Sequence, residues 1–97
     1  LHKRYSEQVK KIDFLKIFTD NGMNNSNHWL ITLILNKPNK SLLKKIFEYT
    51  NKKKIATRPA FKLLHKINYL KKYPRMNLES SIDLENRIIT IPSSAFL

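Results

Sequence analysis

The run from His28 to Leu35, HWLITLIL, is the longest apolar stretch of the chain and constrains its fold more than any other feature. In an extended strand successive side chains point to opposite faces, so the odd positions form a wholly apolar face and the even positions a half-polar one. β-Branched and aromatic residues dominate the run, which is too short to cross a membrane as a helix. It therefore predicts a central strand, covered on one face and partly covered on the other.

The part of the chain before this run predicts a helix and a strand. Apolar residues recur at helical spacing over residues 1–13 and form a narrow stripe, which indicates a helix that lies on a surface. Residues 14–19, FLKIFT, are typical of a strand. The turn-forming residues 20–27 separate that strand from the central run, so we expect the two strands to pair antiparallel across a long hairpin.

A second helix and a short strand are expected after Pro38, which ends the central run. Asn39 or Ser41 can cap a helix that has a broad apolar face and ends within residues 51–54. Residues 55–57 then predict a strand, which a right-handed crossover would place beside the central one. Strand, helix and strand in this order form a split βαβ-like unit.

The last third of the chain is less regular. Residues 60–74 carry apolar side chains at helical spacing between two prolines, which predicts a loop with one or two helical turns. Asn77 can cap a final helix, and residues 87–91, RIITI, predict another strand. We therefore expect residues 1–97 to form one α+β domain, in which helices pack against a small sheet of three to four strands.

Positive charge is the strongest compositional feature, because the formal net charge is +12 and lysines outnumber arginines 15 to 4. One interpretation is an acidic partner such as nucleic acid. Another is the coding bias of an AT-rich genome, since arginine, which contacts bases and phosphates bidentately, is scarce. A third is a small ligand with acidic groups. Because the lysines fall on the outer faces of the expected helices, we expect the charge to be spread over the surface.

Few residues offer chemistry of their own. The three histidines, His2, His28 and His65, have no partner at metal-ligand spacing, and the chain has no cysteine. Gly22 is the one glycine, and the sequence contains no glycine-rich phosphate loop and no nucleophile motif. Seven acidic residues are a poor supply for acid–base catalysis. The sequence therefore predicts no catalytic residue, no cofactor-binding residue and no metal ligand in this chain.

Two stretches nevertheless look suited to binding. SNHW, residues 26–29, places two polar side chains and an imidazole at the start of the central strand, although a turn that feeds a strand explains it equally well. TRPAFKLLH, residues 57–65, has a lone arginine, Arg58, that can clamp a phosphate or a carboxylate. A surface arginine with Phe61 beneath it is the competing interpretation.

Three stretches, SNHWLITLIL, FEYTNKKKIATRPAFKLLHKI and ENRIITIPSS, have an order and spacing that resemble the C-terminal part of the DegT/StrS family of sugar aminotransferases. The likeness is clearest over residues 26–94. Its most specific parts are the TRP-x-F-x-x-x-H stretch and the closing IPSS. Within the family, the chain is most similar to the branch that aminates keto sugars on nucleotides, such as the perosamine-type synthases and the enzymes of the legionaminic acid and bacillosamine pathways.

The resemblance implies a much longer fold-type-I enzyme that depends on pyridoxal 5'-phosphate (PLP), with this chain as its small C-terminal domain. The large domain would hold the Schiff-base lysine and the cofactor. Such an enzyme is a cytoplasmic homodimer that moves an amino group, typically from glutamate, to a nucleotide-linked keto sugar for polysaccharide or amino-sugar synthesis. The substrate-side contacts carried over onto this sequence, which we expect on one rim of the domain, are Asn27, His28, Arg58, Phe61 and His65.

The sequence departs from the family pattern at one helix stop. Related sequences usually have glycine there, whereas this chain has Lys54. A left-handed backbone costs a lysine about 1 kcal/mol relative to glycine, so the stop is either rebuilt or shifted by one residue.

A different class of function also fits the composition. The chain begins with Leu1 rather than Met, which suggests a processed or truncated product. Neither a membrane nor nucleic acid is an expected partner of the aminotransferase. The alternative is a free-standing basic α+β module that binds nucleic acid, and the charge alone supports it.

Overall fold

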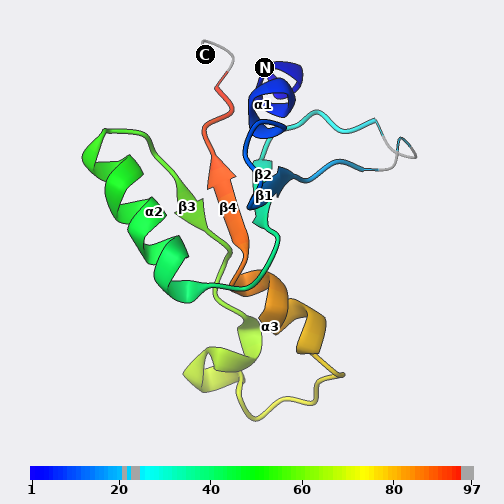
Figure 1. Cartoon of the computed structure of the whole chain (residues 1–97). Coiled ribbons are helices and arrows are strands. Elements are labelled where there is room, and N and C mark those ends of the chain that lie inside the picture. Colours follow the sequence, from blue (N-terminus) through cyan, green and yellow to red (C-terminus); the bar gives the residue numbers. More distant parts are fainter. Residues whose placement is uncertain (21, 23–24, 95–97) are drawn as a thin grey trace.

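The computed structural model describes residues 1–20, 22 and 25–94, which form an open four-stranded sheet with three α-helices (Figure 1). Adjacent strands are antiparallel throughout, in the order β1-β2-β4-β3. The predicted α+β class and the predicted size of the sheet are confirmed. In chain order the elements are α1 (His2–Val9), β1 (Leu15–Ile17), β2 (Ile31–Leu35), α2 (Lys40–Lys52), β3 (Arg58–Pro59), the 3₁₀ turns η1 (Leu64–Lys66) and η2 (Asn68–Leu70), α3 (Glu79–Glu85) and β4 (Ile88–Ile91).

The predicted central strand is present as β2, but it begins at Ile31 rather than at His28. His28 has a positive φ of 52°, which breaks the extended conformation, and Trp29 is 72% exposed outside the sheet. The predicted hairpin with β1 is confirmed, because Leu15 pairs antiparallel with Leu35. The expected connecting turn, residues 20–27, lies partly outside the described residues.

The prediction for the third strand is wrong in position and in partner. The strand is β3, at Arg58–Pro59 instead of residues 55–57, and it pairs with β4 rather than with β2. Proline has no N–H to donate, so a strand that contains Pro59 suits the edge of a sheet. Strand β4 consists mainly of apolar residues, which suit an interior position in the sheet. It lies between β2 and β3. Since β2 and β3 are both antiparallel to β4, they are parallel to each other, which keeps the split βαβ arrangement.

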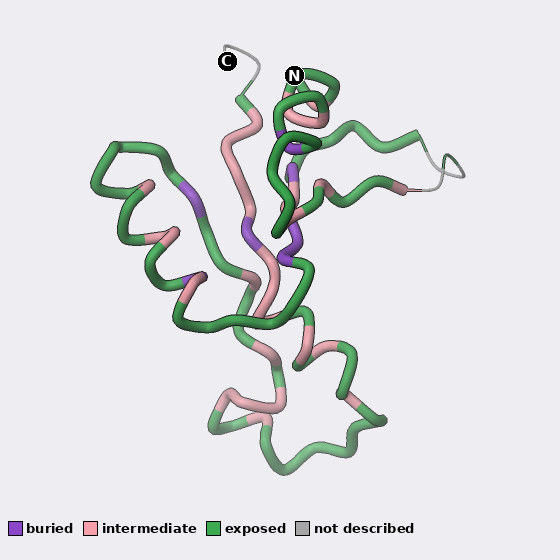
Figure 2. Tube along the Cα trace, viewed as in Figure 1, coloured by how far each residue is buried: buried purple, intermediate pink, exposed green. Residues whose placement is uncertain are grey.

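The hydrophobic core lies between the sheet and α2. Of the two predicted caps, Asn39 and not Ser41 begins this helix, because the side-chain oxygen of Asn39 accepts the backbone N–H of Leu42 at 2.9 Å. Burial of an aliphatic side chain stabilises a fold by about 1.5–3 kcal/mol, and Figure 2 shows the buried positions on the sheet strands and α2. The core consists of Leu35, Leu43 and Ile89, with Leu15, Leu33, Leu42, Ile46, Phe47 and Ile91 packed against it.

The C-terminus of α2 has the left-handed residue that glycine usually supplies. Lys54 has a φ of 61°. Its N–H donates to the carbonyl of Asn51 at 2.9 Å, and the N–H of Ile55 donates to the carbonyl of Thr50 at 2.9 Å. These two hydrogen bonds form the Schellman pattern, which is the helix stop that usually contains glycine. Here Lys54 adopts the left-handed conformation instead, and its side chain makes that conformation less stable than it would be for glycine.

The first helix, α1, is shorter than residues 1–13 and lies against β1. Val9 is buried, and the hydroxyl of Tyr5 donates to the carbonyl of Pro92 at 3.0 Å. The narrow apolar stripe therefore packs on the surface of the sheet, and the Tyr5 hydrogen bond connects α1 to the segment after β4.

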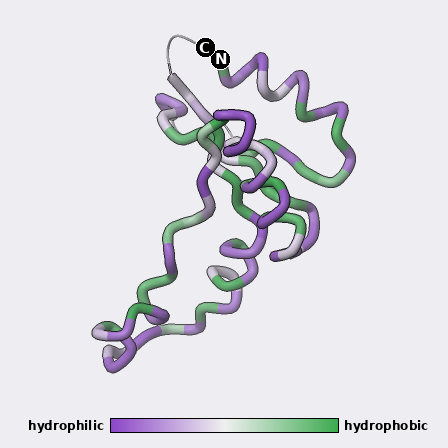
Figure 3. The backbone as a smooth tube through the Cα atoms, turned by 90° about the vertical axis from the view of Figure 1, so that its left-hand side faces the viewer, coloured by the Kyte–Doolittle hydropathy of each residue, from purple (hydrophilic) through white to green (hydrophobic). Residues whose placement is uncertain are grey.

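Residues 60–78, which we call the lobe, project from the end of the sheet that lies away from α1 (Figures 1 and 3). The lobe contains η1 and η2, which confirms the predicted loop with helical turns. Asn77 accepts the N–H of Glu79 at 2.9 Å and so supports the start of α3. No residue of the lobe is fully buried (Figure 2).

Candidate functional site

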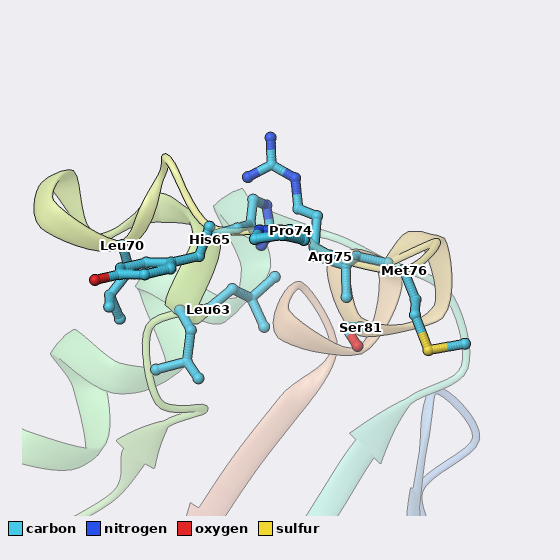
Figure 4. A pocket seen from close by; sticks show the side chains of 10 residues that line it. Leu63, His65, Leu70, Pro74, Arg75, Met76 and Ser81 are labelled. Carbon is cyan, nitrogen blue, oxygen red and sulfur yellow. The ribbon is translucent and has the colours of Figure 1, made fainter.

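A cleft of about 540 Å³ lies between the lobe and α3, and we call it the lobe cleft (Figure 4). Its walls are mainly apolar and carry a few polar groups, a composition that is typical of small-molecule sites. The lining residues are Leu63, Leu64, His65, Leu70, Tyr73, Pro74, Arg75, Met76, Leu78 and Ser81.

Besides the hydroxyl of Tyr73, three polar side chains give the lobe cleft its chemical character. His65 is half-buried in η1, and Ser81 lies on α3. Arg75 is exposed, and its guanidinium extends away from the sheet in Figure 4. Imidazole and hydroxyl groups can donate and accept hydrogen bonds, whereas the guanidinium is a permanent cation with a planar set of donors. The cleft can therefore hold a flat or apolar group against its walls and an anionic or hydroxyl-rich group at its rim.

An ion pair fastens the lobe to α3 beside this cleft. Lys66, at the end of η1, donates to the carboxylate of Glu85, whose side chain is 17% exposed. The hydrogen bond from Lys66 is the main reason why the pKa of Glu85 lies below its ordinary value, and a backbone hydrogen bond from Leu63 acts in the same direction. Burial opposes these effects by raising that pKa. Glu85 is therefore ionised at neutral pH and holds η1 in place.

The other predicted binding stretch, residues 26–29, forms a turn. Ser26 Oγ accepts the N–H of His28 at 3.1 Å, and Asn27 Oδ1 accepts the N–H of Trp29 at 3.0 Å. The ring of His28 stacks on that of His2, with the centroids 4.0 Å apart and the planes at 16°. These contacts favour the interpretation as a turn that feeds β2.

The structure does not bring the predicted site residues together on one rim. Asn27 and His28 lie beside α1, whereas His65 belongs to the lobe at the other end of the sheet (Figure 1). Arg58 is exposed on the edge strand, and Phe61, at the base of the lobe, is 90% exposed. The reason is the parallel course of β2 and β3, which carries the chain from the α1 end to the lobe end. The following loop continues away from the sheet and does not fold back along it.

Sequence reasoning missed two arginines. Arg75 lines the lobe cleft, and the only sequence signal was its place after Pro74 in an otherwise lysine-rich segment. Arg87 is structural and joins α3 to β2. Its Nε donates to the carbonyl of Leu35 at 2.8 Å, and one terminal nitrogen donates to Asp83 at 2.7 Å. The spacing of Asp83 and Arg87, four residues apart in a helix pattern, was a signal for that pair.

The lysines are distributed over several elements of the fold. Exposed lysines occur on α1, on β1, on α2 and in the lobe, so the charge is spread over the surface as predicted. Within residues 1–20, 22 and 25–94, no group of three potential ligands could hold a metal ion. In the same residues, no helix has the length and apolar character needed to cross a membrane.

Comparison with known proteins adds one match. The model of the DegT/DnrJ/EryC1/StrS aminotransferase family matches residues 1–97, which is the whole of this chain, and supports an aminotransferase function. No curated protein and no solved structure matches the chain.

Proposed function

Because this chain belongs to the DegT/DnrJ/EryC1/StrS aminotransferase family, we propose that it serves the transfer of an amino group to a nucleotide-linked keto sugar. The family match over residues 1–97 is the observation that carries the proposal. The stretches SNHWLITLIL and TRPAFKLLH favour the branch that makes amino sugars of the perosamine, legionaminic acid and bacillosamine type. Glutamate is the proposed amino donor, and cell-surface polysaccharide or amino-sugar synthesis in the cytoplasm is the proposed setting.

We assign the cofactor of this reaction to a larger domain outside these residues. PLP supplies the electron sink that lets an amino group pass between carbon skeletons. A lysine that binds PLP as a Schiff base requires a desolvated pocket. Here fourteen of the lysines are exposed and Lys66 is engaged by Glu85, so the residues of this chain do not fit the cofactor.

In this proposal the chain contributes substrate contacts, and the lobe cleft is where they gather. Its apolar walls accept a flat nucleobase, and Arg75 at the rim complements a phosphate. His65 and Ser81 can hydrogen-bond the hydroxyl groups of a sugar. Their contribution is to bind and orient the substrate, because a reacting group held in position meets a lower barrier.

The other predicted substrate contacts do not line the lobe cleft, so they require a partner surface from another domain or subunit. Arg58 on the edge strand β3 and Phe61 at the base of the lobe are both exposed, so a neighbouring domain can close over them. Asn27 and His28 lie at the opposite end of this domain and cannot reach the same cleft. We propose that they face another part of the assembled homodimer.

One experiment separates the role of this chain in binding the substrate from the role of the larger domain in binding PLP. The chain alone, given PLP, glutamate and a nucleotide-linked 4-keto sugar, is expected to form no amino sugar and to cause no PLP absorbance shift. Fused in frame to the PLP domain of a family enzyme that lacks its own small domain, it is expected to restore turnover. Turnover by the chain alone would contradict the assignment of the cofactor, and a folded fusion that binds PLP but aminates no keto sugar would contradict the proposed function.

A variant of the fusion tests the cleft itself. His65→Ala is expected to raise KM for the nucleotide sugar about tenfold, because a substrate hydrogen bond is lost. Lys45→Ala, an exposed position on α2, is the matched control and is expected to leave KM unchanged. Equal effects of the two substitutions would show that the cleft has no role in binding.

A further inference from the structure

The acidic residues of this chain are unevenly distributed. No aspartate or glutamate occurs between Glu48 and Glu79, whereas nine lysines and arginines do. This interval contains the entire lobe. Lys62, Lys71 and Lys72 of the lobe are all exposed, and the lobe has no carboxylate of its own. The nearest carboxylates belong to α3, where Glu85 pairs with Lys66 of the lobe.

The same lobe exposes large apolar and aromatic side chains. Met76 is 88% exposed and Tyr69 is 72% exposed, and Tyr73 is also largely exposed. The ammonium of Lys72 lies 5.5 Å from the centroid of the Tyr73 ring. In Figure 3 the lobe is the projecting lower end of the molecule, where hydrophobic and hydrophilic residues alternate along the tube. We call residues 69–76, YLKKYPRM, the tip.

We propose that the tip docks on an anionic lipid surface. Tyrosine rings and lysine side chains combine an apolar body with a polar end and so suit the boundary between lipid headgroups and acyl chains. Lysines near an anionic leaflet are attracted to it, and exposed side chains such as Tyr69, which does not line the lobe cleft, leave water when they enter the boundary. Docking of this kind uses a surface and needs no spanning helix.

Nucleic acid fits the tip less well. Sequence and phosphate recognition favours arginine, and the tip has two lysines and one arginine, which the lobe cleft uses. The phosphate backbone of a nucleic acid offers no apolar surface for exposed apolar side chains of the tip, whereas the boundary of a lipid bilayer does. The observations therefore favour a bilayer over a nucleic acid.

Vesicle binding by the full 97-residue chain tests the proposal. We expect it to sediment with vesicles of phosphatidylcholine that contain about 30% phosphatidylglycerol and to stay in solution with pure phosphatidylcholine. Lys71 and Lys72 do not line the lobe cleft, so Lys71→Gln with Lys72→Gln leaves that site intact. The double substitution is expected to weaken binding about 25-fold, because each lysine contributes about a factor of five. Tyr69→Ser is expected to weaken it about fivefold.

The matched control is Lys10→Gln with Lys11→Gln, which removes the same charge at the α1 end. It is expected to weaken binding less than about threefold, and circular dichroism of each variant confirms that the fold is kept. An equal loss in the control would mean that only net charge matters, and it would overturn the proposal. So would an absence of binding to the anionic vesicles, equal binding to neutral ones, or tighter binding to a DNA duplex than to vesicles at the same salt concentration.

Discussion

The sheet and the lobe contain similar apolar residues but bury them very differently. In the sheet, Leu35 and Ile89 are each 1% exposed, and α2 covers them. In the lobe, Leu64 is 70% exposed, although its spacing from neighbouring apolar residues is equally regular. The difference is a second layer, because each strand is paired with another and faces a helix, whereas the lobe has only α3 on one side. Hydrophobic periodicity therefore shows which residues can be buried, and topology decides which of them are.

The largest expected effect comes from truncating a leucine in each region. Leu35→Ala is expected to lower the free energy of unfolding by about 3 kcal/mol, because it leaves a cavity in the core. Leu64→Ala is expected to change it by less than about 0.5 kcal/mol, because that side chain is already largely in water. Urea unfolding of both variants measures the contrast. Similar losses at the two positions would show that the lobe is packed as tightly as the sheet.

The next effect concerns the joint between α3 and the sheet. Arg87→Met is expected to cost about 2 kcal/mol, because the carbonyl of Leu35 and the carboxylate of Asp83 lose a charged partner. Arg75→Met, in the lobe, is the control and is expected to change stability by less than about 0.5 kcal/mol. Thermal unfolding of the two proteins compares them, and a neutral Arg87→Met would mean that α3 is held by packing alone.

The attachment of the lobe is expected to depend on pH. The pKa of Glu85 is lowered in the folded state, mainly by Lys66, so its contribution to stability is complete above its unfolded pKa. That contribution is lost as the pH falls through the folded pKa. Glu85→Gln is expected to cost about 1 kcal/mol at neutral pH and to make stability less dependent on pH in the acidic range below the ordinary pKa of a glutamate.

Glu48→Gln is the matched control for this pH dependence. Its carboxylate is paired with Lys44 at 3.9 Å, and both side chains are mostly in water, so the pair stabilises the helix little. Urea midpoints at several pH values should separate the two variants. Identical pH profiles for both would mean that the pair of Lys66 and Glu85 does not hold the lobe.

The smallest expected effect is a gain. Lys54→Gly is expected to raise stability by about 0.5–1 kcal/mol, because glycine adopts a positive φ without steric cost. Lys53→Gly, one residue earlier and with a φ of −82°, should lower stability by a similar amount. Differential scanning calorimetry can resolve both changes, and a loss of stability in Lys54→Gly would contradict the left-handed helix stop.

The sequence predicted the sheet better than it predicted the site. The α+β class, the hairpin of β1 and β2 and the Asn39 cap follow from local periodicity and turn chemistry, and the structure has them. The order of the strands does not follow from local pattern, because the insertion of β4 beside β2 is a choice between distant segments. The prediction that the substrate-side residues lie on one rim of the domain is wrong for the same reason. The lobe cleft depends on Arg75 and Ser81, which only the fold brings near His65.

We propose that the nucleotide sugar binds at the lobe cleft and not at the α1 end. Titration of the ¹⁵N-labelled chain with UDP-N-acetylglucosamine, followed by NMR to about 10 mM, tests it directly, since a weak partial site has an affinity in the millimolar range. We predict shifts at the amides of His65, Arg75 and Ser81 and none at Asn27 or His28. Shifts at Asn27 and His28 with an unchanged lobe cleft would contradict the claim, and so would an unchanged spectrum throughout.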